Sequence, residues 1–339
     1  MGQMFFPGED QNGNEGYEIA WGRVFLAIIV AVFVGYGVYW LVSSCSSSRG
    51  EKIAVAEVVS EMPVEEPVEE EEVIEEIEEV IPSFNFEAYK YYRSSEDAEI
   101  ELKADFPTGE SIVADSIRQY IHEIFGGQYR CSYENAQDIL NYYGDKEFRD
   151  YEKEHQETVE NIERNNDDEN EETFTVSAYK SWTYFKVDCI EDRFVTYKVE
   201  SYFWTGGIHE LGGEYGATFN RINGKRVNYS YFTNLESRPF KRIIKEGLKR
   251  YFQNNDWAAS DDEELAECLL NVEDVNNIPL PSAEPYFTPK GVCFKYCSYE
   301  IASYAAGFPS FVLPYDKARP YMTEEAFDLI GDTESLVAE

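Results

Sequence analysis

The feature that most constrains this 339-residue chain is one long apolar segment near its N-terminus. Residues Val24–Ser44 include no charged side chain. As an α-helix with a rise of about 1.5 Å per residue, the segment spans about 30 Å, the thickness of a bilayer's hydrocarbon core. Trp21 precedes it and Trp40 lies near its end, where indole rings favour the headgroup layer. We therefore predict a transmembrane helix at residues 24–44, after a short tail at residues 1–23.

A lipoprotein signal is the alternative interpretation of the same segment. Val42–Cys45 resembles a bacterial lipobox, in which Cys45 is acylated after cleavage. However, the apolar region of a signal peptide is about 7–15 residues long and follows several bases, whereas only Arg23 precedes this segment. The sequence thus favours the retained helix. One base, Arg23, precedes the segment and two, Arg49 and Lys52, follow it. Since cytoplasmic flanks carry more bases, this difference of one charge favours a cytoplasmic C-terminal part.

An acidic stretch with few apolar side chains that could form a core follows the apolar segment. Residues 51–80 hold thirteen Glu and one Lys, and Pro63 and Pro67 prevent one continuous helix. Like charges at this density extend a chain, so we interpret residues 45–82 as an acidic spacer. A docking motif for a basic partner is the alternative. The whole chain carries a net charge of −37, which argues against nucleic-acid binding and favours a basic partner.

The rest of the chain predicts an α+β fold, with a largely antiparallel sheet and helices packed on it. We divide it into an N-terminal α+β subdomain at residues 83–172 and a C-terminal domain at residues 173–332. The predicted strands lie at residues 84–92, 98–106, 173–187, 193–204, 214–222, 292–298 and 310–314. The predicted helices lie at residues 111–125, 133–143, 240–251, 260–270 and 323–330. Ser260 and Glu263 are predicted to form a capping box, and residues 150–172 a polar helix that frays into a loop.

Side chains that carry chemistry are sparse. The chain has three histidines, and none has the spacing of a metal site or of a catalytic motif. We therefore expect no metal, no cofactor, no catalytic residue and no enzyme activity. Because acidic residues are abundant, a hydrolase of wall polysaccharide that uses two carboxylates is kept as an alternative.

The five cysteines beyond Cys45 cannot all pair within one chain. Cys293 and Cys297 are too far apart on a predicted strand for a direct bridge. We expect ordinary buried thiols, with one disulfide or a metal pair as the alternatives.

Two loops stand out as candidate binding segments. Thr205–Gly213 holds four glycines, among them Gly206 and Gly207, around His209. It is either a flexible hairpin loop or a loop that presents His209 to a partner. Tyr299–Gly307 holds Tyr299, Glu300 and Tyr304 beside small residues. We expect it to determine the fold by burying its rings, with a binding surface as the alternative.

A basic segment is the third candidate. Six bases crowd one predicted helix of a very acidic chain, namely Arg238, Lys241, Arg242, Lys245, Lys249 and Arg250. We expect a solvated face that balances nearby acids, and the alternative is contact with an anionic glycan or lipid.

These motifs resemble a known bacterial family. Phe287–Gly291, Tyr299–Gly307 and Leu313–Tyr315 resemble the C-terminal signature of the RsiV-like extracytoplasmic domains, whose function is unknown and which also occur beside peptidoglycan deacetylases. Thr205–His209 is similar to the G-G-A-H segment of that family, and Asn223–Lys225 to its T-G-K turn. Residues 100–125 resemble the partner domain that usually precedes it, so that the resemblance covers about residues 84–330.

The resemblance implies a membrane-tethered binding domain of the cell envelope, held outside the cytoplasm. In the lysozyme-sensing anti-sigma factor of this family the domain binds lysozyme, so lysozyme is one candidate ligand here and a wall glycan is the other. The resemblance makes Gly206, Gly207, His209, Tyr299, Glu300 and Tyr304 hypothetical ligand-binding residues. Only 23 residues precede the apolar segment, which is short for a domain that binds a sigma factor, and no deacetylase sequence follows. A structural envelope protein without a soluble ligand is a further alternative.

Overall fold

The computed structural model describes residues 81, 83–127, 135–165 and 176–331, and all of them fall within one unit of the chain, Glu76–Glu339. The predicted transmembrane helix or lipoprotein signal at residues 24–44, Cys45 and nearly all of the acidic spacer lie outside these described residues. Within the part that is described, no helix is both long enough and apolar enough to cross a membrane.

A five-stranded sheet is the largest element. Its strands are β1 (Asn85–Ser94), β2 (Ala98–Thr108), β3 (Tyr179–Ile190), β4 (Phe194–Trp204) and β5 (Leu211–Asn220), in spatial order 1-2-3-4-5. The α+β class is confirmed, but this sheet is mixed, because β2 and β3 run parallel while the other neighbours are antiparallel. Parallel neighbours need a long crossover, and the two helices between β2 and β3 supply it.

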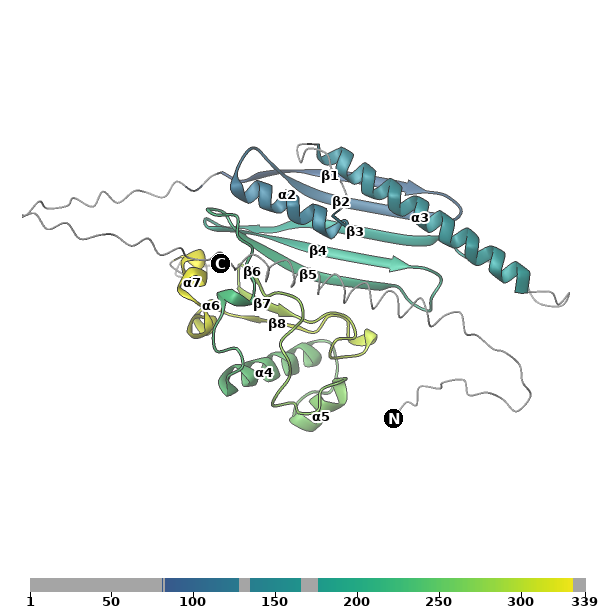
Figure 1. Ribbon diagram of the computed structural model, residues 1–339. Coiled ribbons are helices and arrows are strands. Elements are labelled where there is room, and N and C mark those ends of the chain that lie inside the picture. The colour runs from purple at the N-terminus through teal and green to yellow at the C-terminus, as the bar shows by residue number, and fades with distance from the viewer. Residues whose placement is uncertain (1–80, 82, 128–134, 166–175, 332–339) are drawn as a thin grey trace, which may run out of the picture. The chain divides into compact units, whose positions relative to one another are not determined.

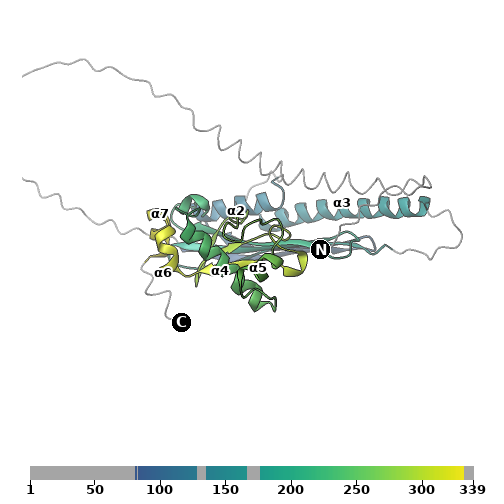
Figure 2. The same ribbon diagram turned by 90° about the horizontal axis from the view of Figure 1, so that it is seen from below.

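Those two helices, α2 (Ile112–Ile124) and α3 (Ala136–Asn165), cover one face of the sheet (Figures 1 and 2). The Ser111 hydroxyl begins α2 by accepting a hydrogen bond from the Ala114 amide. Helix α3 joins the predicted helix at residues 133–143 and the start of the predicted polar helix at residues 150–172 into one continuous helix. Its acidic half is fixed to the sheet where the His155 imidazole lies 3.0 Å from Asp97 and 5.2 Å, ring to ring, from Tyr179.

The C-terminal elements form a second layer on the opposite face of the sheet. They are α4 (Arg238–Asn254), α5 (Asp262–Cys268), β6 (Tyr286–Thr288), β7 (Gly291–Lys295), β8 (Ser310–Leu313), α6 (Tyr315–Ala318) and α7 (Glu324–Ile330). Short 3-10 turns lie at Tyr229–Tyr231, Tyr304–Ala306 and Arg319–Tyr321. The strands make a three-stranded antiparallel sheet in order 6-7-8, and α4 packs on β8. Strand β6 was not predicted, because three residues are too few to show an alternating pattern.

Strand β4 separates two hydrophobic cores. Val195 and Tyr197 point to the core beneath α2 and α3, while Phe194 points to the core of the C-terminal layer. Between the layers, the Thr196 hydroxyl donates to the carbonyl oxygen of Phe287, and the Phe287 amide donates to Thr218. Strands before and after the predicted boundary at residues 172 and 173 therefore pair in one sheet; the boundary itself stays a prediction.

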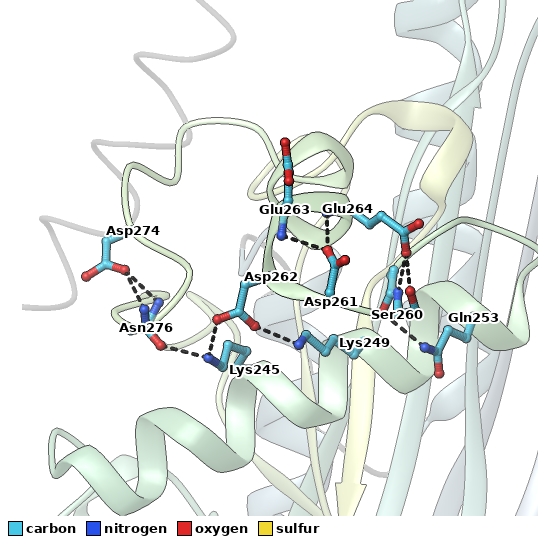
Figure 3. Close-up of polar contacts among 11 residues, drawn as sticks. Lys245, Lys249, Gln253, Ser260, Asp261, Asp262, Glu263, Glu264, Asp274 and Asn276 are labelled. Atoms are coloured by element: carbon cyan, nitrogen blue, oxygen red, sulfur yellow. Dashed lines mark hydrogen bonds and ion pairs between the residues drawn. The ribbon is translucent and has the colours of Figure 1, made fainter.

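The start of α5 corrects the predicted capping box. The cap is Asp261, whose carboxylate accepts hydrogen bonds from the amides of Glu263 and Glu264 at 2.9 Å (Figure 3). Ser260 lies one residue earlier, and its amide and hydroxyl both donate to the Glu264 carboxylate. Asp is as good a cap as Ser, so two adjacent candidates in sequence left the first helical residue ambiguous by one position.

Candidate binding site

The glycine-rich segment forms the loop between β4 and β5, as the sequence predicts. Gly206 has φ 86°, a left-handed conformation that disfavours other residues. The Trp204 indole Nε1 donates to the carbonyl oxygen of Gly207 at 2.8 Å, and this bond closes the start of the loop. Gly206 and Gly207 thus shape a defined hairpin end.

The side chain of His209 extends from this loop and packs against the Tyr299–Gly307 segment. Its ring stacks on Tyr304 with centroids 3.9 Å apart and an interplanar angle of 14°. Its Nε2 lies 3.1 Å from the Tyr299 hydroxyl, and its Nδ1 lies 3.0 Å from the carbonyl oxygen of Glu210. Because a carbonyl oxygen only accepts, Nδ1 donates to it, and in the neutral imidazole Nε2 then accepts from the Tyr299 hydroxyl. Three of the sequence-predicted residues therefore meet, although about ninety positions separate them.

Glu300 has a different role from its neighbours. Its two carboxylate oxygens accept hydrogen bonds from the backbone amides of Ser282 (2.6 Å) and Cys297 (2.7 Å). Both bonds hold the turn in which Tyr299 adopts the left-handed conformation with φ 63°. The carboxylate of Glu300 is thus used inside the fold, and it supports Tyr299 instead of pointing to the cluster around His209.

Exposed apolar side chains also lie at this end of the hairpin, and sequence reasoning missed them. Ile208 is fully exposed at the tip of the loop. Phe203 and Leu211, which are partners across β4 and β5 on the face of the sheet that α2 and α3 cover, are each about two-fifths exposed. Tyr299 is also exposed. The sequence feature that could have predicted this exposure was Ile208, an isoleucine among glycines. A purely flexible loop would carry polar residues at such a position. We call Phe203, Ile208, His209, Leu211, Tyr299 and Tyr304 the hairpin-end surface.

Two cavities lie at opposite ends of β5. One, of about 370 Å³, lies beside the hairpin end and is lined by Lys180, Trp182, Tyr202, Phe203, Trp204 and Glu210. The other, of about 440 Å³, lies among α2, the turn after β5 and α7. Side chains that line this second cavity contact one another: Lys225 pairs with Glu325 at 3.0 Å, and the Arg226 guanidinium lies over the Tyr120 ring. Its charged groups are thus already partnered.

The part of the chain after the β4–β5 hairpin matches a known family. Residues 233–316 match the family model described as protein of unknown function (DUF3298). These residues form a DUF3298 domain. Tyr299, Glu300 and Tyr304 belong to the DUF3298 domain, whereas His209 comes from the preceding hairpin. The hairpin-end surface is therefore built jointly by the DUF3298 domain and the sheet before it.

A solved DUF3298 protein shares the fold. A member from Bacteroides fragilis NCTC 9343 aligns over 75% of this chain and 99% of its own length, with a TM-score of 0.62 and 16% identity. A protein from Pseudomonas aeruginosa PAO1 aligns over 72% of this chain and 95% of its own, with a TM-score of 0.48 and 15% identity. No curated protein matches the chain.

The basic helix of the DUF3298 domain is neutralised from within. Lys245 and Lys249 of α4 both bind the Asp262 carboxylate, at 2.8 and 2.6 Å (Figure 3). Lys241 is buried, and its Nζ donates to the carbonyl oxygen of Ile278 at 3.1 Å and pairs with Glu236 at 2.8 Å. These lysines balance nearby acids, as the sequence favours, but their side chains are largely buried instead of forming the predicted solvated face. Their donors are used in the fold.

The remaining titratable groups serve the core. Among the described residues, no group of His, Cys, Asp and Glu could hold a metal ion. Burial lowers the pKa of His122, which contacts the Tyr143 hydroxyl between α2 and α3. In the described part, the carboxyl groups whose pKa is raised are Glu147 and Glu191, both mainly by burial. Neither of them lines one of the two cavities.

The four cysteines of the described part, Cys189, Cys268, Cys293 and Cys297, are free thiols. Burial raises the pKa of each of them, so the protonated thiol is favoured. Cys131 lies outside the described residues.

Proposed function

We propose that this chain is a membrane-anchored binding protein of the bacterial cell envelope, with its folded part outside the cytoplasm. The observation that carries the proposal is the hairpin-end surface, where the exposed side chains of Ile208 and Tyr299 adjoin the stacked rings of His209 and Tyr304. The anchor at residues 24–44 and the spacer at residues 45–82 are sequence predictions that complete it.

The hairpin-end surface has the properties of a preorganised contact site. Large apolar side chains exposed together are unusual on a protein without a partner. The loop that carries them is fixed by the Trp204 bond to Gly207 and by the two contacts of His209. A fixed loop loses little conformational entropy on binding, so more of the contact energy appears as affinity.

The charge of the chain supports a basic protein as the ligand. With 66 acids against 29 bases, the protein attracts a cationic partner over a long range and accelerates their encounter. Lysozyme is such a partner, and the RsiV-like resemblance of Tyr299–Gly307 names it.

The test is a titration of the full-length chain with lysozyme and, separately, with soluble peptidoglycan fragments. We expect lysozyme to bind at low salt and to bind more weakly as salt rises. Ile208→Ser should weaken binding about tenfold, or about 1.4 kcal/mol, and Ile112→Ser, which alters another exposed isoleucine on α2, should leave it unchanged. No binding of either ligand at low salt would reject the proposed function, and equal effects of the two substitutions would reject the hairpin-end surface.

A further inference from the structure

The cavity of about 370 Å³ beside the hairpin end lies on the side of the sheet away from α2 and α3. Trp182 of β3 and Tyr202 of β4 are directly opposed, and their rings stack with centroids 4.2 Å apart. The Tyr202 hydroxyl donates to Glu214 at 2.9 Å, and Glu214 also binds Lys295 of β7. One wall of the cavity is therefore made of two large rings on rigid strands.

Trp204 supplies a third ring on the same face, two residues beyond Tyr202 along β4. Its indole is oriented by the hydrogen bond from Nε1 to Gly207. Among the described residues, no other ring packs against it, although its side chain is half-buried and lines the cavity. The contact between Trp182 and Tyr202 across the two strands stabilises the sheet, which explains why these two rings are there. It does not explain the fixed indole of Trp204, which no other ring of the described part covers.

Two side chains of opposite charge complete the lining. Lys180 is the strand partner of Trp204 and pairs with Glu99 at 3.2 Å, which leaves other ammonium protons free to donate. Glu210 follows His209 in the loop, and no side chain of the described part pairs with its carboxylate. The cavity thus offers one group that only donates and one that only accepts.

This combination selects for a particular ligand chemistry. Aromatic faces favour a ligand with an apolar face, and the ammonium and carboxylate favour hydroxyl groups, which both donate and accept. Lys180 and Glu210 have opposite charges, so together they give the lining no net charge and favour a ligand that carries none. The volume is at the lower end of the range of about 300–1,000 Å³ typical of small-molecule sites, so only one or two rings fit.

We propose that this cavity binds a neutral saccharide, with a pyranose ring against Trp182, Tyr202 and Trp204 and its hydroxyls at Lys180 and Glu210. The site uses residues outside the hairpin-end surface, apart from Phe203 at its margin. It goes beyond the protein ligand proposed above and does not depend on it.

The experiment uses the full-length chain in a detergent without a sugar headgroup. Cellotetraose and chitotetraose are the neutral probes, and glucosamine and galacturonate tetramers are the charged ones. Tryptophan fluorescence and calorimetry measure affinity. We expect at least one neutral probe to bind and both charged probes to bind more weakly. No response to either neutral probe, or equal affinity for a charged one, would overturn the proposal.

Substitutions locate the site. Trp204→Ala should weaken saccharide binding by about tenfold or more. Glu210→Gln should weaken it several-fold, and because Glu210 is exposed this substitution should not change the stability of the fold. Tyr92→Ala, which removes an exposed ring elsewhere on the same sheet, is the matched control and should have no effect. Neutral-probe binding that survives both Trp204→Ala and Glu210→Gln would refute this location.

The two proposals can fail separately. Ile208→Ser should weaken lysozyme binding and leave saccharide binding intact. Glu210→Gln should weaken saccharide binding in a titration that contains no lysozyme. Loss of saccharide binding in Ile208→Ser would assign the ligand to the hairpin-end surface and overturn the separate cavity site.

Discussion

Helix α4 and the β4–β5 hairpin both stand out in the sequence, yet the structure uses them in opposite ways. The lysines of α4 bind a carboxylate or a carbonyl oxygen of the same chain. At the hairpin end, Ile208, Phe203 and Leu211 remain exposed to solvent. The comparison teaches that an unusual composition marks an external site only where the fold leaves its groups without internal partners.

The difference arises from where each element sits. Helix α4 packs on β8 and buries Phe240, Ile244 and Leu248, so its lysines at the edge of this face reach α5 and the segment after it. The β4–β5 loop extends beyond the strands, where few side chains can cover it. Substitutions in α4 should therefore change stability, and substitutions in the loop should change binding.

Phe240→Ala should have the largest effect. Phe240 is fully buried and packs edge-on against Phe294 and Tyr321. Truncating such a ring leaves a cavity, and we expect the free energy of unfolding to fall by about 3–5 kcal/mol. Urea unfolding followed by tryptophan fluorescence measures it. A loss below about 1 kcal/mol would show that α4 is not part of the cooperative core.

Lys241→Met should have the next largest effect. The substitution keeps the buried stem but leaves the carbonyl oxygen of Ile278 without its charged donor. A hydrogen bond of this kind contributes about 1.5–3 kcal/mol, and we expect a loss of unfolding free energy in that range. Arg242→Met, at an exposed position of the same helix, is the control. Equal stability of the two variants would mean that Lys241 is held only by its stem.

Asp262→Asn should have a smaller effect that depends on pH. Hydrogen bonds from Lys245 and Lys249 lower the pKa of Asp262 below 3.8 in the folded protein. The carboxylate therefore stabilises the fold above pH 3.8, and its contribution is lost as pH falls through the lowered folded value. The difference in urea midpoint between wild type and variant should be present at pH 7 and disappear in acid. A difference that stays constant with pH would contradict the ion-pair account.

Ile208→Ser should have the smallest effect on folding. The side chain is fully exposed, so the unfolding free energy should change by less than about 0.5 kcal/mol, although the affinity for lysozyme falls. Parallel urea unfolding and binding titrations of one preparation separate the two effects. A stability loss comparable to that of Lys241→Met would remove the contrast between the hairpin and α4.

Much of the fold could be predicted from local patterns. Alternation at Ile100, Leu102 and Ala104 located β2, and the helical spacing from Phe240 to Tyr251 located α4, because each pattern reports which face is buried. The parallel pairing of β2 with β3 could not be predicted, since about seventy residues separate the two strands. The helical character of the acidic half of α3 was predicted, but its continuity with the helix at residues 133–143 was not. The contacts of His155 with Asp97 and Tyr179, which fix that half to the sheet, come from distant parts of the chain.

The same division holds for the candidate site. The sequence determined that Thr205–Gly213 holds a hairpin connection and that Tyr299–Gly307 is a tight segment, because glycine permits the positive-φ conformations that tight turns need. Only the tertiary structure decided that His209 stacks on Tyr304, that Glu300 is used by backbone amides, and that the indole of Trp204 lines a cavity beside Glu210. Contacts between residues so far apart depend on how strands and layers pack, and no local pattern encodes that.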